Sequence, residues 1–134
     1  NSLLIRLYGA KKFFINSNTN FGSYIIGLYY ESSPIVLEVI ANNQSFATES
    51  YQLLKDIEPY IVDLTTNSGG QLEISSSFVV KIENYFKKLD SLLPNNHPSK
   101  IKISQLLDRI KIQETVGLNS KQAWSRLVQN YDAQ

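Results

Sequence analysis

The hydrophobic and polar positions of residues 1–41 form three dense apolar runs. LLIRLYGAKKFFIN, SYIIGLYYE and IVLEVIA are rich in β-branched and aromatic residues, and the turn-rich segments NSNTNFG and SSP separate them. Apolar runs bounded by Gly, Pro, Asn and Ser are typical of β-strands. Pro34 would stand at the start of a strand, where its missing N–H does least harm. The pattern predicts a three-stranded meander.

The next stretch predicts one helix and a hairpin. TESYQLLKDIE has helical spacing, with Thr48 as its N-cap and Pro59 at its end, because the residue before proline avoids helical geometry. YIVDLTT and QLEIS then alternate apolar and polar positions around NSGG, which is typical of a β-hairpin. The meander and the hairpin together predict an antiparallel sheet of about five strands.

Helical spacing returns after the hairpin. SSFVVKIENYFKKLDSLL predicts a second packing helix, and PNNHPS at 94–99, with two prolines, predicts a linker. IKISQLLDRIKIQET and SKQAWSRLVQNY predict two more helices. We therefore expect an α+β fold with residues 1–93 as a sheet domain covered by two helices. Residues 100–134 would be a two-helix basic extension packed on the same core.

Composition and charge narrow the class of protein. With 134 residues, 43% of them hydrophobic, the chain can bury one core, and its net charge of +1 gives no general case for nucleic acid. Residues 98–134 nevertheless hold six Lys and Arg against three acids, whereas residues 1–97 hold seven against nine. Because the chain starts at Asn1 and contains no Met, we expect it to be part of a longer protein.

The sequence favours neither catalysis nor a cofactor. It has no Cys, and its single histidine, His97, stands in the predicted linker without a partner at a meaningful spacing. NSGG lacks the lysine of a phosphate-binding loop. No apolar run approaches the ~20 residues of a membrane helix, and no signal peptide is visible. We expect a non-enzymatic protein without metal or cofactor, located in the cytoplasm or nucleus and not in a membrane.

The last predicted helix has an unusual polar side. Winding residues 121–131 at 3.6 residues per turn places Ala123, Trp124, Leu127, Val128 and Tyr131 on one arc. The opposite arc carries no acid and consists of Lys121, Gln122, Ser125, Arg126 and Gln129. Arg and Gln side chains can recognise bases, and Lys and Ser can hold phosphates. This acid-free arc is typical of a helix that enters a DNA groove.

The segment VGLNSKQAWSRLV resembles the helix-turn-helix of lactose-repressor-type regulators. The resemblance implies that Gly117 makes the turn, Leu118 packs between the helices and Ser120 caps the second helix. It also implies the following roles: Leu106, Leu107, Ile110 and Ile112 as the apolar residues of the first helix, and Lys121, Gln122, Ser125 and Arg126 facing DNA. The turn is one residue longer at Asn119, and Gln113 stands where the family has alanine. The resemblance says nothing about residues 1–97.

Two functions follow as hypotheses. The first is a DNA-binding, transcription-regulatory module that reads DNA through Lys121, Gln122, Ser125 and Arg126, with Lys100, Lys102 and Arg109 as phosphate contacts. The second is a non-catalytic protein-interaction domain of a larger assembly, which binds a protein partner or a second copy through a sheet edge or the Trp124 helix. Burial of Trp124 would fit DNA binding or a plain core role, and exposure would favour a protein partner.

Overall fold

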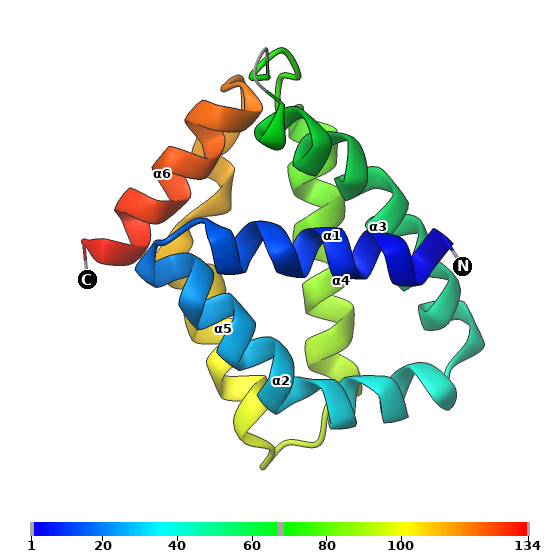
Figure 1. The fold of residues 1–134 in the computed structure, drawn as a ribbon. Helices are drawn as coiled ribbons and strands as arrows, with labels where there is room; N and C mark the ends of the chain where they lie inside the picture. The colour runs from blue at the N-terminus through cyan, green and yellow to red at the C-terminus, as the bar shows by residue number, and fades with distance from the viewer. Residues whose placement is uncertain (1, 67–68, 134) are drawn as a thin grey trace.

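Helices run through almost all of the residues that the computed structural model describes, which are residues 2–66 and 69–133 (Figure 1). The elements in chain order are α1 (Ser2–Asn16), α2 (Asn20–Ala41), α3 (Gln44–Thr65), α4 (Ser76–Leu92), α5 (Pro98–Ile110), the 3-10 helix η1 (Ile112–Thr115) and α6 (Ser120–Asp132).

The predicted α+β fold with its five-stranded sheet is wrong, because the described residues form an all-helical structure. The expected meander is α1 and α2, and YIVDLTT is the last part of α3. Nearly continuous apolar runs fit a buried strand and a helix equally well, so their periodicity could not separate the two. The predicted helices are confirmed in type at α4, α5 and α6, and TESYQLLKDIE is confirmed as the middle of α3.

The structural positions predicted for two prolines, a strand start for Pro34 and a helix end for Pro59, are wrong. Pro34 lies inside α2 and Pro59 lies inside α3, which continues to Thr65. A proline inside a helix removes one backbone hydrogen bond and crowds the preceding turn. Both prolines are exposed, so the freed carbonyls can be hydrated. The helices therefore pass through residues that usually end them.

Short polar side chains fix where the helices begin. Asn43, not Thr48, caps α3 by accepting the N–H of Phe46 at 3.0 Å, and Thr48 instead donates to the carbonyl of Gln44. Asn119, not Ser120, caps α6 in a capping box with Gln122. Each true cap precedes the first helical residue in extended geometry, as capping requires.

The segment between α3 and α4 runs back over the start of α6. Ile74 N–H donates to the Leu118 carbonyl at 2.8 Å, and Ser120 N–H donates to the Leu72 carbonyl at 2.9 Å. The predicted hairpin partner QLEIS therefore makes one isolated antiparallel bridge with residue 119 and no sheet. The predicted NSGG turn lies partly outside the described residues.

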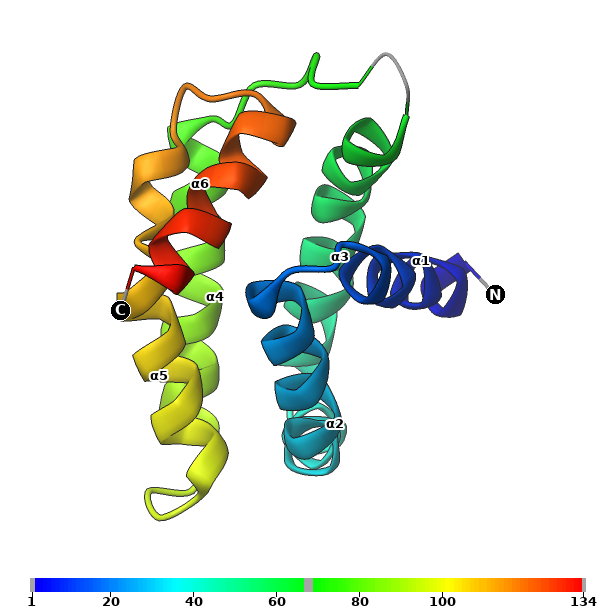
Figure 2. The same ribbon diagram turned by 60° about the vertical axis from the view of Figure 1, so that its left-hand side comes forward.

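The helices form two groups that face each other across the core. In Figure 2, α4, α5 and α6 lie on one side and α1, α2 and α3 on the other. One buried cluster joins Phe46 of α3 to Leu89, Leu93 and Ile103 of α4 and α5, and a second centres on Ile74, Val79 and Ala123. Among the described residues, no helix combines the length and the apolar character that a membrane crossing requires.

Candidate functional site: the α1–α2 face

One row of exposed residues along α2 contains no charged side chain. The members of this row recur at alternating intervals of four and three, and we call them the α2 stripe: Ser23, Gly27, Tyr30, Pro34, Leu37 and Ala41. The exposed acids Glu31 and Glu38 lie beside the stripe. Tyr30 is 54% exposed and Leu37 is 63% exposed. The outward side of a surface helix is normally charged or polar. The α2 stripe instead has the spacing of a seam that packs against another helix.

The neighbouring helix α1 has a similar outward row, the α1 stripe. Its members, spaced by three, four and three residues, are Ile5, Tyr8, Lys12 and Ile15. Ile5 is 71% exposed and Tyr8 is 70% exposed. Lys11 Nζ lies 4.8 Å from the centre of the Tyr30 ring, so the two stripes adjoin. We call them together the α1–α2 face.

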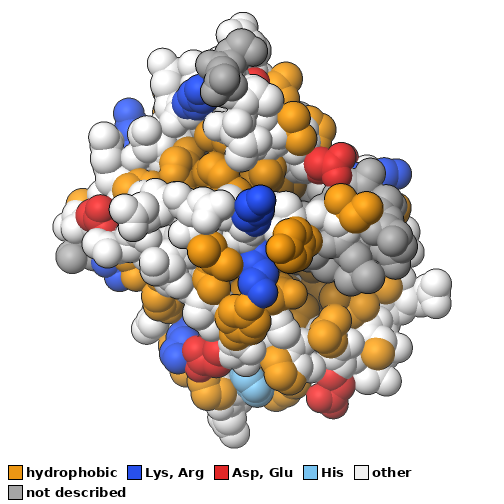
Figure 3. Space-filling view, viewed as in Figure 1, with side chains coloured by type: hydrophobic (Ala, Val, Ile, Leu, Met, Phe, Trp, Pro, Cys, Tyr) orange, Lys and Arg blue, Asp and Glu red, His pale blue; other side chains and the backbone are white. Residues whose placement is uncertain are grey.

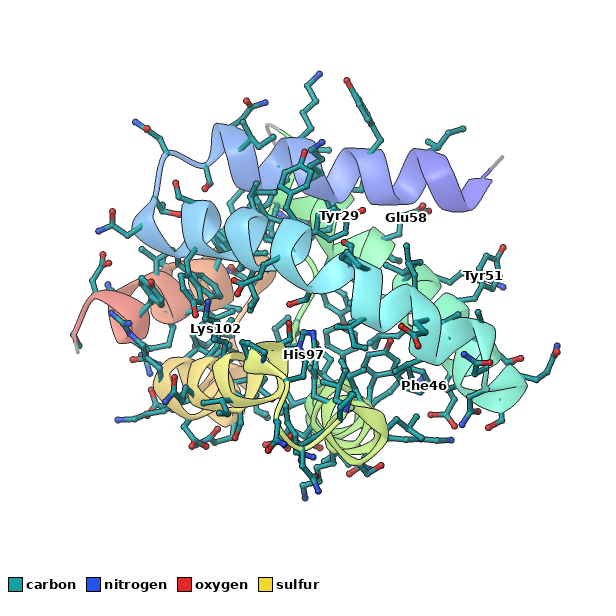
Figure 4. The ribbon with its side chains drawn as sticks, turned by 90° about the horizontal axis from the view of Figure 1, so that it is seen from below. Tyr29, Phe46, Tyr51, Glu58, His97 and Lys102 are labelled. Carbon is teal, nitrogen blue, oxygen red and sulfur yellow. The ribbon has the colours of Figure 1, made fainter. Side chains whose placement is uncertain are left out.

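Hydrophobic side chains gather over this part of the molecule in the space-filling view. Figure 3 shows them around Lys and Arg side chains in the middle of the face, while Asp and Glu side chains lie nearer its edge. Tyr29 lies between α1 and α2 in Figure 4, and its ring meets that of Tyr30 edge to face at 5.5 Å. Aromatic and aliphatic side chains with a few cations are typical of the centre of a protein interface.

The two helices of the face carry opposite charges. The charged residues of α1 are all basic (Arg6, Lys11 and Lys12), and those of α2 are both acidic (Glu31 and Glu38). This site is not visible in the sequence when residues 1–41 are assigned to strands, because a spacing of three and four has no meaning in a strand. The signal was present as the uncharged four-three repeat from Ser23 to Ala41.

Trp124 is half-buried and packs against the aromatic side chains of α1 and α2. Its ring stacks on Phe21 at 5.2 Å and meets Phe13 edge to face at 5.0 Å. Tyr131 contacts Phe21 and Tyr24 from the same side of α6. These contacts join α6 to α1 and α2, so much of the aromatic surface of α6 is used within the chain.

The three predicted phosphate contacts are engaged within the chain. Lys102 Nζ lies 2.7 Å from Glu31 Oε1, a pairing that raises the pKa of Lys102, and Figure 4 shows its side chain between α5 and α2. Lys100 Nζ donates to the Asp90 carbonyl at 2.6 Å. Arg109 Nε donates to the Tyr131 carbonyl at 2.7 Å. These cations hold helices together in the free protein.

The four predicted base-reading residues lie on one side of α6, and they differ in their exposure and in their contacts within the chain. Lys121, Gln122 and Ser125 are exposed. Gln122 Oε1 accepts the N–H of residue 119 in the capping box at 3.1 Å, and Arg126 Nη1 lies 3.6 Å from Glu114 Oε1. The connection from α5 to α6 contains η1 and is longer than the tight turn that the helix-turn-helix resemblance implies.

The carboxylate of Asp63, from α3, lies at the start of α6. The carboxylate of Asp63 accepts the hydroxyl of buried Ser120 and the N–H groups of Gly70, Gln71 and Leu72. The Ser120 hydroxyl makes the largest contribution to lowering the pKa of Asp63, and the backbone donors add to it. A fixed negative charge at this end of α6 opposes the approach of a DNA phosphate.

His97, the single histidine, has a structural role at the start of α5. His97 caps α5 by accepting the N–H of Ser99 at 3.1 Å, and Ser99 accepts the hydroxyl of Ser32 at 2.9 Å. Among the described residues no group of three or more His, Cys, Asp and Glu could hold a metal ion. A groove of about 500 Å³ between α4 and α5 has an apolar floor, including Phe86 and Leu107, and a rim of both charge signs. It selects no ligand class.

No protein-family model matches the chain, and no curated protein or solved structure matches it either.

Proposed function

We propose that the chain is a non-catalytic protein-interaction domain that binds through the α1–α2 face. The observation that carries the proposal is the uncharged α2 stripe, which leaves Tyr30 and Leu37 in solvent at the spacing of a helix-packing seam. The binding surface is therefore neither a sheet edge nor the Trp124 helix. Action by binding alone and a location in the cytoplasm or nucleus belong to the same proposal.

Other helices support the α1–α2 face from its inner side. α1 packs on α3 and α2, and α2 also packs on α6 and α5. The backbone under both stripes is therefore held by helices on its inner side, while the outer side is uncovered. A surface that is ordered before binding loses less conformational entropy when a partner docks.

Comparative capture tests this proposal. The immobilised chain is incubated with an extract of its source cells alongside Leu37→Glu and the matched control Val80→Glu. Val80 is also a half-exposed aliphatic residue, but it lies on α4. A protein, a second copy included, should be retained by the unaltered chain and by Val80→Glu and lost from Leu37→Glu. Retention of the same proteins by all three chains contradicts the proposal.

DNA binding through α6 is the second candidate. The observation that favours it is the exposure of Lys121, Gln122 and Ser125 on a side of α6 without acids over its first turns. Fluorescence anisotropy with random duplex DNA tests it. Binding that falls steeply with salt and weakens in Lys121→Ala and Arg126→Ala is the expected result. Absence of binding at about 50 mM salt rejects this function for the chain.

A further inference from the structure

We infer that the occupant of the α1–α2 face is a second copy of this chain, with α1 of each copy lying along α2 of the other. The inference rests on the proposed function and specifies its partner. Three features carry it: the spacing of the two stripes, the charges of the two helices and the angle between them.

The stripes have the periodicity that two packed helices need. Both rows recur at intervals of three and four, so each presents one continuous ridge to a straight partner helix. The α2 stripe offers small residues at Ser23, Gly27 and Ala41, which allow close approach, and larger ones at Tyr30 and Leu37. The α1 stripe supplies the aromatic and aliphatic side chains Tyr8 and Ile15 that can fill such gaps.

The charges make the face complementary to itself. α1 carries only basic residues and α2 only acidic ones. Lys11 contacts Tyr30 and Glu31 pairs with Lys102 within the same chain, so Lys12 and Glu38 are the charges that carry this argument. Lys12 and Glu38 have no ionic partner among the described residues. Laying α1 on α2 of another copy brings opposite charges together twice in a dimer, whereas laying α1 on α1 and α2 on α2 brings like charges together. Charge complementarity of this kind selects one arrangement over the other.

The angle between the helices permits the same arrangement. Figure 1 shows α1 and α2 diverging from their connection at residues 17–19. A two-fold axis that lies above the face, parallel to the bisector of this angle, turns the direction of α1 into that of α2 and the direction of α2 into that of α1. Each α1 then lies along the partner's α2, and the contact is the closed, isologous kind that most homodimers use.

Sedimentation velocity from about 1 to about 200 µM tests the inference. We expect a dimer, with Kd raised at least about tenfold by Leu37→Glu and unchanged by Val80→Glu. Thermal melts followed by circular dichroism establish that each variant is folded. A chain that stays monomeric throughout the range overturns the inference, and so does a dimer indifferent to Leu37→Glu.

Charge reversal tests the orientation. Lys12→Glu places an acid on the α1 stripe and should weaken the dimer at least about fivefold, and adding Glu38→Lys should restore it. A double variant that stays as weak as Lys12→Glu alone overturns the pairing of α1 with α2. A monomeric chain that still captures another protein in a Leu37-dependent way overturns self-association and leaves the proposed function standing.

Discussion

Single side chains join parts of this molecule that are distant in sequence. The Asp63 carboxylate connects the end of α3, the segment after it and the start of α6. Phe46 is fully buried and stacks on Tyr85 at 4.8 Å, which joins α3 to α4. Neither role was visible in the sequence, because a hydrogen-bond partner or a stacking partner is set by the tertiary fold.

Removal of the Asp63 carboxylate should loosen the start of α6. Because the pKa of Asp63 is lowered in the folded state, its stabilising contribution is present above the unfolded value of about 3.9 and is lost as pH falls through the folded pKa. Asp63→Asn should therefore melt at a lower temperature than the unaltered chain at pH 7, with a smaller difference near pH 3. Glu73→Gln, a change at an exposed acid nearby, is the control. An equal difference at both pH values contradicts the role.

Truncation of Phe46 should be among the most damaging single changes. Phe46→Ala removes a fully buried ring from the larger core cluster, and we expect the free energy of unfolding to fall by about 3–5 kcal/mol. Urea denaturation followed by circular dichroism measures the change. Val80→Ala, on the exposed side of α4, should change stability by less than about 0.5 kcal/mol. A loss at Phe46 no larger than that at Val80 would refute the packing described.

At the scale of elements, the sequence predicted the type of α4, α5, α6 and the middle of α3, and it failed for α1, α2 and the end of α3. α4, α5 and α6 have strong helical periodicity and clear polar sides, so their type could be read directly. α2 has an apolar residue at almost every inward and outward position, and its own side chains therefore gave no contrast. The absence of charge that makes the α2 stripe a candidate binding surface is also what hid its helical period.

Substitution of a proline inside a helix tests whether α3 continues through residue 59. Pro59→Ala should raise the free energy of unfolding by about 1 kcal/mol or more, because it restores a helical N–H in the interior of α3. Pro98 begins α5, where proline is well tolerated, so Pro98→Ala should bring no gain. If residue 59 stood at a helix end, the two substitutions would have the same effect on the urea midpoint.

Substitution in the capping box of α6 tests whether Asn119, as observed, or Ser120, as the sequence predicted, caps this helix. Asn119→Ala removes the side-chain oxygen that accepts the N–H of Gln122 at 2.9 Å. We expect the free energy of unfolding to fall by about 1 kcal/mol. Asn119→Ser keeps a capping oxygen and should recover most of the loss. A substitution with alanine that leaves the urea midpoint unchanged would show that the cap lies elsewhere.

At the scale of the whole molecule, the chain exposes more surface than is expected for a folded monomer of its mass. Its accessible surface is 8022 Å², against about 7,100 Å² expected for a folded monomer of 15.2 kDa. Part of this excess lies on the α1–α2 face, where large apolar side chains remain in solvent. The sequence showed enough apolar residues for a core, but it could not show which of them the fold leaves uncovered.

Site-specific photo-crosslinking tests the central claim, that the α1–α2 face is where this protein binds another protein. A photoreactive phenylalanine analogue replaces Tyr30 in one chain and Val80 in a second, and both are irradiated in an extract of the source cells. We predict discrete protein adducts, which include the dimer of the chain itself, from position 30 and none above background from position 80. Equal adduct formation from the two positions, or none from position 30, would contradict the claim.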